Sequence, residues 1–406
     1  MDRLLSALAL SALAVAPCLA AQSPFDATVD LRAVAADGEP SFLDGGLGEL
    51  RFDDQHDGVR IGDIRLGYHD DFYQIVHVTL EAMSYGDDPH DPLDLTEALI
   101  EIRPFPLNGW RSRLKIGAFY APISLESRLE GWRSGYSLSP SALNTWVGEE
   151  LRTIGMEYDL DWLGRQRGHD WELGLAASAF GWNDSAGALL AQRGWAIHDR
   201  QTTLFGRVGT AGQTQSAVVP DVREFYGIDQ RVGYYGAAEA KYRDALELRA
   251  LHYDNRADPA AYAPRLQSYA WHTRFNSAGA RWTPSEQWTL ISQWLGGHTD
   301  SGEADDQYGW EFHAAFVLAS YQTGANQLSA RYDGFEMHQN APALEPFYNA
   351  DRGHAWTIAY TRQFGSHWSV LLEGLQIDSR LAARVFLDEP VAAVERELQL
   401  ALRLDL

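Results

Sequence analysis

Apolar and polar side chains alternate residue by residue along most of this chain. The C-terminal segment 397–406 shows the simplest form, because every even position is leucine and the odd positions are polar or small. Successive side chains of a β-strand point to opposite faces of the sheet, so this period places the leucines on one face and Gln399, Arg403 and Asp405 on the other. The chain is therefore predicted to be an all-β protein.

Sixteen segments carry this alternation or a related pattern, and short and long connections alternate between them. Each segment is long enough to cross a bilayer as a tilted strand, which takes about 9–11 residues. Short turns at one end and long loops at the other are typical of a transmembrane barrel. We predict a single transmembrane antiparallel β-barrel of 16 strands, with 14 or 18 strands as alternatives. The predicted strands are 27–36, 59–69, 72–83, 93–103, 111–121, 150–161, 171–182, 232–243, 246–254, 268–282, 288–298, 308–320, 326–338, 354–363, 368–378 and 395–406.

The N-terminal residues 1–21 are predicted to be a secretory signal peptide. A basic residue, an apolar run over 4–16 and small residues before a polar stretch match such a signal. Cys18, the only cysteine, falls within it, so the exported chain lacks disulfides and a cysteine metal site. A lipoprotein signal is the alternative for Cys18, but Pro17 stands where that signal needs a small residue. Residues 22–406 then form one barrel domain.

Aromatic residues gather where the predicted strands end. Amphipathic rings occupy the two membrane interfaces of transmembrane barrels, whereas a soluble sandwich or propeller would carry a polar outer face. The membrane barrel is therefore favoured over a secreted soluble β protein. The rings predicted to lie at the interfaces are Trp282, Trp288, Trp310, Trp356, Trp368, Tyr68, Tyr120, Tyr158 and Tyr360.

Charged side chains recur on the face opposite the apolar one. In 308–320, Glu311 and His313 alternate with Phe312 and Phe316, so we expect the first two to face the lumen and the others to face lipid. A water-filled lumen removes the cost of burying unpaired charge. The predicted lumen wall comprises Arg113, Lys115, Arg152, Glu247, Arg249, Glu311, His313 and Arg331.

Three short segments resemble the phosphate-selective porin O and P family. Residues 115–126 match that family's turn, in which glycine, aromatic residues, proline, serine and glutamate open a long loop, and 150–155 and 328–336 look like further pieces. The resemblance implies a sixteen-stranded, homotrimeric porin whose third outer loop folds inward and narrows the channel. Apart from the resemblance, the export signal and the alternation of short turns with long loops predict the outer membrane of a Gram-negative bacterium, with membrane lipid and lipopolysaccharide as partners.

The loop 122–149 is the candidate for the inward-folded loop, since loops longer than about 12–15 residues are often functional. Charged rings at a narrow point decide which ions pass. The predicted pore constriction consists of Glu126, Arg128, Glu130 and Arg133. We expect its glutamates to face the basic wall residues Arg113, Lys115 and Arg152. A solvated outer loop is the alternative.

The connection 183–231 is the longest in the chain. Apolar residues within 186–202 fall partly at helical spacing, which predicts a short helix that plugs or caps the channel. The alternative is a segment that packs only on neighbouring loops.

Catalytic, metal and cofactor motifs are not found in the sequence. The acidic runs 86–92 and 300–306 lack the complete ligand spacing of a calcium loop, and no nucleophile elbow or His-Glu-x-x-His motif occurs. We therefore predict no catalytic residues, no metal, no cofactor and no enzymatic activity. An excess of 56 acidic over 33 basic residues also excludes a general nucleic-acid binder.

The predicted function is a porin-like channel for passive diffusion of small hydrophilic solutes or ions. The net charge of −23 departs from the excess of cations expected in a phosphate channel, and the chain ends in Leu406 where such barrels usually end in an aromatic residue. Cations and anions are nearly balanced in the predicted constriction, so we expect weak selectivity and no strong phosphate site. The alternative is a nonconducting barrel that serves as scaffold, adhesin or assembly partner.

Overall fold

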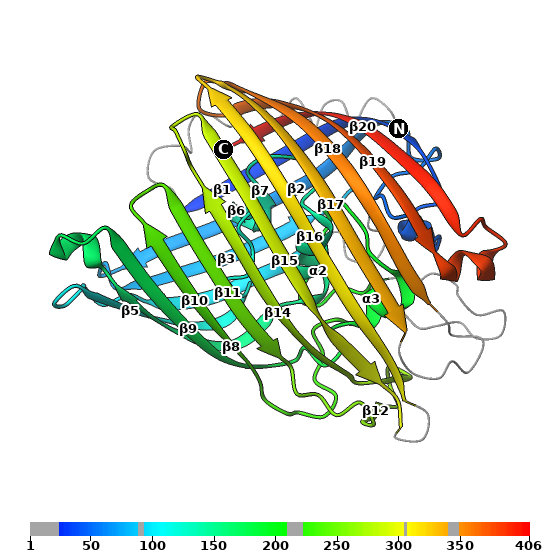
Figure 1. The fold of residues 1–406 in the computed structure, drawn as a ribbon, viewed down its shortest axis with the longest axis horizontal. Helices are drawn as coiled ribbons and strands as arrows, with labels where there is room; N and C mark the ends of the chain where they lie inside the picture. Colours follow the sequence, from blue (N-terminus) through cyan, green and yellow to red (C-terminus); the bar gives the residue numbers. More distant parts are fainter. Residues whose placement is uncertain (1–23, 88–92, 209–221, 304–306, 340–348) are drawn as a thin grey trace.

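Sixteen antiparallel strands close into one barrel in the computed structural model (Figure 1). The structure describes residues 24–87, 93–208, 222–303, 307–339 and 349–406. The predicted signal peptide, with Cys18, and the parts 88–92 and 304–306 of the two acidic runs lie outside the described residues. The predicted fold class and strand number are confirmed.

The barrel strands follow one another in chain order around the ring, and β1 closes it by pairing with β20. Two additional hairpins, β6–β7 (Ser127–Leu129, Arg133–Ser134) and β12–β13 (Tyr262–Ala263, Ser268–Tyr269), stand apart from it. The barrel strands are β1 (Phe25–Asp37), β2 (Gly58–Phe72), β3 (Val76–Ser84), β4 (Asp94–Ile102), β5 (Trp110–Phe119), β8 (Thr153–Trp162), β9 (Trp171–Gly181), β10 (Gly233–Tyr242), β11 (Leu246–Asp254), β14 (Trp271–Trp282), β15 (Trp288–Ser301), β16 (Tyr308–Thr323), β17 (Asn326–Gln339), β18 (Ala350–Phe364), β19 (Trp368–Leu381) and β20 (Ala392–Asp405).

The two ends of the barrel differ in their connections. At one end of the barrel, called here the short-turn end, the first strand begins and the last strand finishes. The same end carries tight turns such as 324–325. Gly324 has a φ of 55° there, a left-handed conformation that glycine adopts without a Cβ clash. The other end, called the long-loop end, carries connections such as 120–152 and 182–232. This arrangement matches the predicted alternation of loop lengths except at 302–307, which is shorter than the connections 103–109 and 163–170 of the short-turn end.

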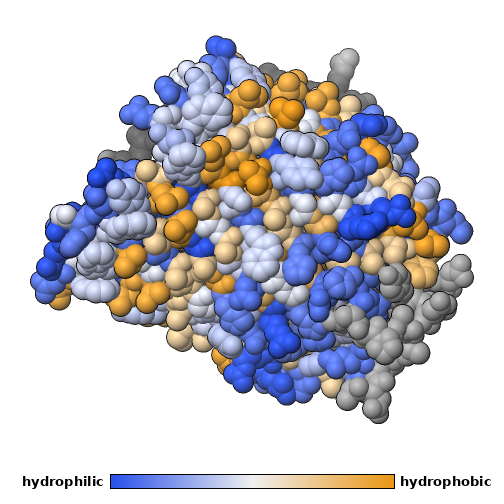
Figure 2. All heavy atoms as spheres, viewed as in Figure 1, coloured by the Kyte–Doolittle hydropathy of each residue, from blue (hydrophilic) through white to orange (hydrophobic). Residues whose placement is uncertain are grey.

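Strand β20 has the two faces that its sequence predicts. Leu398, Leu400 and Leu402 point out of the barrel with 54%, 48% and 41% of their surfaces exposed, whereas Gln399 and Arg403 are buried inside. Figure 2 shows hydrophobic side chains across the middle of the barrel's outward face and hydrophilic ones gathering toward its lower edge. An apolar outward face with a polar inward face suits a barrel surrounded by lipid.

Strand β16 has its two faces the other way round from the prediction. Phe312 and Phe316 are buried inside the barrel, and Glu311 and His313 are exposed on its outward face. The interior next to β16 is filled by apolar side chains rather than by water, so aromatic residues are favoured there. Alternation defines two faces of a strand, but it does not say which face is enclosed.

Most of the predicted interfacial rings lie on the outward face, but two do not. Trp282, Trp288 and Trp356 are 49%, 44% and 55% exposed. Trp310 is buried inside the barrel, and Tyr120 stacks on the ring of Trp132 at a centroid distance of 4.2 Å. Both corrected rings contribute to the packing of long connections inside the barrel.

Within the described residues, helical structure is confined to the connections. The helices are α2 (Ala142–Glu150) and α3 (Ala188–Arg193), with 3-10 turns η2 (Phe42–Asp44), η3 (Glu130–Trp132), η4 (Gly164–Arg167) and η5 (Ala382–Leu387). Ser141 caps α2 by accepting a hydrogen bond from the Asn144 amide. In the part of the chain that is described, no helix has both the length and the hydrophobicity to cross a membrane.

Candidate functional site inside the barrel

The connection 120–152, called here the first inward segment, folds into the barrel and binds its wall. The Glu126 carboxylate accepts a hydrogen bond of 2.7 Å from the Arg331 guanidinium on β17. It also accepts hydrogen bonds of 2.9 Å from the Ser141 amide and of 2.9 Å from the Asn144 side chain. Farther along, the Leu138 amide donates to the Glu373 carboxylate of β19 at 2.6 Å. Because Glu126 and Arg331 are both fully buried, this pair fixes the segment at depth inside the barrel.

The same segment reaches two nearly opposite walls. Arg128 donates to the Glu247 carboxylate of β11 at 2.9 Å, and Arg65 of β2 donates to the Glu130 carboxylate at 3.0 Å. Strands β11 and β2 are seven places apart in the ring of sixteen. On the β11 side, Arg249 also donates to the carbonyl oxygen of Ser124 at 3.2 Å. The first inward segment therefore crosses the lumen and is held by charge on both sides.

The described parts of 182–232, called here the second inward segment, enter the barrel as well. The Trp195 amide donates to the Asp351 carboxylate of β18 at 2.7 Å, and the Leu204 amide donates to the Leu95 carbonyl of β4 at 2.7 Å. Asp199 accepts a hydrogen bond of 2.9 Å from Arg51. The segment carries the helix α3, which lies within the predicted helical stretch 186–202.

The two inward segments bind each other through the end of α2 and both ends of the short helix α3. Arg193 donates to the Glu149 carboxylate at 3.0 Å, and the Leu190 amide donates to Glu150 at 2.6 Å. Burial raises the pKa of Glu149, but Arg193 and His198 outweigh it and lower the pKa to about 2. Burial raises the pKa of Glu150 to about 8, although the amides of α3 oppose this shift. The two adjacent carboxyls thus differ in charge at neutral pH.

An apolar core lies inside the barrel toward the long-loop end. The Trp146 ring of α2 lies 5.4 Å from the ring of Phe275, 5.1 Å from that of Phe312 and 6.1 Å from that of Trp195. Residues of both inward segments and of the inner wall belong to this core. On the side of β14 to β17, the lumen is therefore closed by packed side chains.

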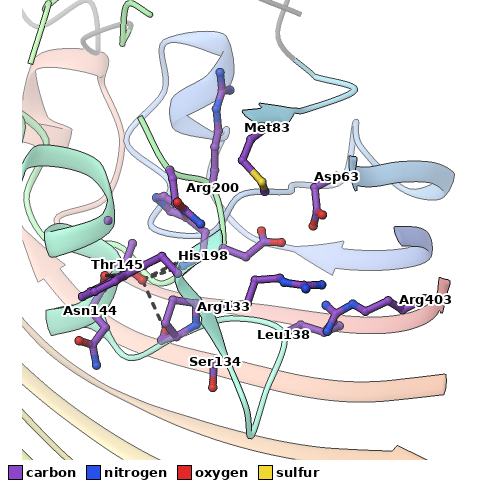
Figure 3. A pocket seen from close by; sticks show the side chains of 15 residues that line it. Asp63, Met83, Arg133, Ser134, Leu138, Asn144, Thr145, His198, Arg200 and Arg403 are labelled. Carbon is purple, nitrogen blue, oxygen red and sulfur yellow. Dashed lines mark hydrogen bonds between the residues drawn. The ribbon is translucent and has the colours of Figure 1, made fainter. Parts of the chain in front are cut away.

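A charged crevice remains between the first inward segment and the wall formed by β2 and β20. Figure 3 shows Arg133 of the segment and Arg403 of β20 reaching into the same space, with Asp63 of β2 above them. Its enclosed volume is about 10 Å³, which corresponds to roughly one water molecule. Its lining also includes Ser134, His198, Asp199 and Arg200.

Opposite charges are interleaved around the crevice. Arg403 donates to the Asp30 carboxylate at 3.0 Å, and Arg32 contacts both Asp63 and Asp199. Burial raises the pKa of Asp199, but the guanidiniums of Arg32 and Arg51 hold it well below its usual range. Burial and the nearby Arg403 lower the pKa of Arg133 to about 10. The crevice therefore offers cations and anions side by side.

The inner wall toward the short-turn end is charged and partly exposed. Arg113 and Lys115 of β5 pair with Asp159 and Glu157 of β8 at 2.9 Å and 2.6 Å. A hollow of about 320 Å³ lies between the first inward segment and the turns of this end, with Arg128 in its lining.

The predicted site residues fall into three groups. The first inward segment brings Glu126 to Arg331, and Arg128 to Glu247 beside Arg249. A second group, Arg113 and Lys115, pairs with Asp159 and Glu157 of β8 and does not meet the glutamates of the segment. Glu130 and Arg133 point instead toward the wall of β2 and β20, and Arg152 stacks on Tyr120 at 3.5 Å.

Two expectations for these residues are corrected. Glu126 and Glu130 were expected to face Arg113, Lys115 and Arg152, but their cationic partners are Arg331 and Arg65. Glu311 and His313 were expected on the lumen wall, but both lie on the outward face of β16. In each case the packing of the inward segments decides the position.

The charged residues of β1, β2 and β20 around the crevice were missed by the sequence analysis. The sequence spacing could have indicated them. Asp30 and Arg32 are two residues apart, as are Asp63 and Arg65, so each pair lies on one face of its strand. The position of Asp199 could not be predicted in this way, because Asp199 lies in a connection and not in a strand. Its partners Arg32 and Arg51 are 167 and 148 residues away in sequence.

Comparison with solved structures relates the fold to outer-membrane proteins. A loop-deletion variant of OmpT from Vibrio cholerae superposes with a TM-score of 0.51 and 9% sequence identity over 94% of this chain and 99% of that chain. The outer membrane channel DcaP of Acinetobacter baumannii gives a TM-score of 0.52 and 10% identity over 94% and 96% of the two chains. At these identities the likeness is one of fold.

Sequence comparison adds no assignment to this likeness. No protein-family profile matches the chain, and no curated protein matches it. The resemblance to the phosphate-selective porin O and P family therefore rests on the three short segments described above.

Proposed function

We propose that this protein is a porin-like channel for small hydrophilic solutes or ions in the outer membrane of a Gram-negative bacterium. The observation that carries the proposal is the first inward segment, which charge pairs tie to the walls of β2, β11 and β17. A segment held across a polar lumen is suited to narrowing a passage. The crevice beside this segment encloses only about 10 Å³, so the proposed conduction requires movement of the second inward segment.

Weak selectivity is part of the proposal. Arg133 and Arg403 line the crevice together with Asp63 and Asp199, so neither sign of charge dominates its narrowest part. Rings of one sign are needed for strong ion preference. We therefore propose that size and polarity, rather than charge, decide which solutes pass.

Conductance in planar lipid bilayers tests this function. Replacing residues 186–197 with a short Gly-Ser linker removes α3 and Trp195, and we expect it to raise the single-channel conductance several-fold above that of the wild-type protein. The matched control replaces 260–269 in the same way, because this β12–β13 region also lies at the long-loop end but is largely exposed. The control is expected to conduct like the wild-type protein. Equal conductance of all three proteins would contradict the proposed role of the second inward segment.

A nonconducting barrel is the second candidate, and the apolar core around Trp146 favours it. Aromatic packing of this kind stabilises a closed interior and gives no benefit to a permanently open pore. Absence of conductance from both the wild-type protein and the 186–197 replacement would support this candidate. Assembly as a homotrimer, which the family resemblance implies, stays a prediction.

A further inference from the structure

Histidines gather on the outward face of the barrel near its long-loop end. Six of the thirteen histidines in the chain occupy outward-facing positions on neighbouring strands β11 and β14 to β18. Acidic side chains and arginines alternate with them, and His338 lies 3.4 Å from the Glu311 carboxylate. We call this region, together with the outward-facing residues of the neighbouring strand β19, the polar band. Its histidines are His252, His272, His298, His313, His338 and His354.

Aromatic rings mark the boundary between the polar band and the apolar belt. Trp294, Tyr332 and Trp356 are 42%, 40% and 55% exposed. Along their strands they lie nearer to the short-turn end than the histidines do. The Tyr332 ring lies 4.7 Å from that of Trp356 and 5.9 Å from that of His354. Such rings sit at the level of lipid headgroups, so the polar band lies at the depth of the headgroups.

Two arginines in the band face each other across neighbouring strands. Arg352 of β18 is registered directly opposite Arg380 of β19, and both are exposed. Like charges placed directly opposite destabilise a pair of strands. Glu336 and Asp378 are registered beside Arg352 and His354, yet within the described residues neither arginine forms an ion pair with a carboxylate. An external anion would relieve this repulsion.

We propose that the polar band binds the phosphate groups of lipopolysaccharide, with Arg352 and Arg380 as the central contacts. The planar guanidinium can donate two parallel hydrogen bonds to a phosphate. Two guanidiniums side by side are therefore suited to bind a phosphorylated sugar. His354 adds a further nitrogen beside them, while Trp356 contacts the region where sugar meets acyl chain. The inference rests on the proposed outer-membrane location of the channel, with the long-loop end at the outer surface of the cell.

Binding of purified lipopolysaccharide to the protein in detergent micelles tests this inference. The double variant Arg352→Gln/Arg380→Gln is expected to retain about tenfold less lipopolysaccharide than the wild-type protein after size-exclusion chromatography, since it loses charge-assisted contacts. The matched control is Arg362→Gln, because Arg362 is exposed on the outward face of the same strand at the opposite end. It is expected to retain as much as the wild-type protein. Excess inorganic phosphate is expected not to displace the lipid.

Equal retention by the double variant and the wild-type protein would overturn the inference. Complete displacement by inorganic phosphate would also overturn it, because the site would then recognise free phosphate rather than the lipid. The double variant is expected to conduct like the wild-type protein, since both arginines lie outside the lumen. Loss of lipopolysaccharide with unchanged conductance therefore separates this inference from the proposed channel function.

Discussion

Arg331 is the residue on which the first inward segment depends most. Its buried guanidinium contacts Glu126 and Asp333, and its removal leaves two carboxyls without their cation. Breaking a buried ion pair on one side costs about 3–5 kcal/mol. We expect Arg331→Met to lower the free energy of unfolding in detergent micelles by this amount. Urea unfolding measured by tryptophan fluorescence gives this free energy. Arg362→Met is the exposed control, and Arg331→Met/Glu126→Gln should recover part of the loss.

Leu402 provides a second test at the scale of single residues. It lies near the middle of the outward leucine row of β20, at a position that the bilayer would cover. An arginine near the bilayer midplane costs about 2–4 kcal/mol, and this cost falls to about 0–1 kcal/mol near the interface. We expect Leu402→Arg to destabilise the refolded barrel in lipid vesicles by the larger amount and Leu406→Arg by the smaller one. Similar costs at both positions would mean that the apolar belt is placed wrongly.

Among the structural elements, the second inward segment should respond to pH. Burial beside Glu150 and Glu149 raises the pKa of Glu224 well above its usual range, and the pKa of Glu150 rises from 4.5 to about 8. A carboxyl with a raised pKa binds its proton more tightly in the packed state than in the loosened state. The packing of the segment therefore weakens as the pH rises from 4.5 toward 8. It also weakens as the pH falls from 4.5 toward 2, because the Glu149 carboxylate then loses its stabilising pair with Arg193, so the packing is most stable near pH 4.5.

The loosening of the second inward segment can be measured as protease accessibility and as conductance between pH 5 and about 9. We expect both to increase with pH in the wild-type protein. Glu224→Gln should reduce the dependence, because an amide stays neutral throughout, and Glu150→Gln/Glu224→Gln should flatten it. Glu130→Gln is the control, since the Glu130 side chain is 59% exposed and lies outside the buried cluster. A pH dependence that is undiminished in Glu224→Gln would exclude this carboxyl as a source.

For the whole molecule, the net charge of −23 is a poor guide to permeation. Screening limits each exposed charge to about 8–10 Å at ordinary salt, so the crevice residues decide selectivity. We expect a reversal potential close to zero in a potassium chloride gradient. Arg133→Glu should shift it toward cations, whereas Arg396→Glu on the outward face should not. Strong anion selectivity of the wild-type protein, or block by low phosphate, would contradict weak selectivity.

The sequence by itself determined the barrel, because the alternation of side chains and of connection lengths is local information that each strand carries independently. It also identified the inner face of β20, where leucines face outward and Gln399 is buried. The assignment failed for β16, because Phe312 faces inward against Trp146, a ring supplied by a distant connection. The partners of Glu126 and Asp199 could likewise not be predicted from the sequence. Arg331 is 205 residues from Glu126, and such contacts depend on how the inward segments fill the closed barrel, which only the tertiary structure decides.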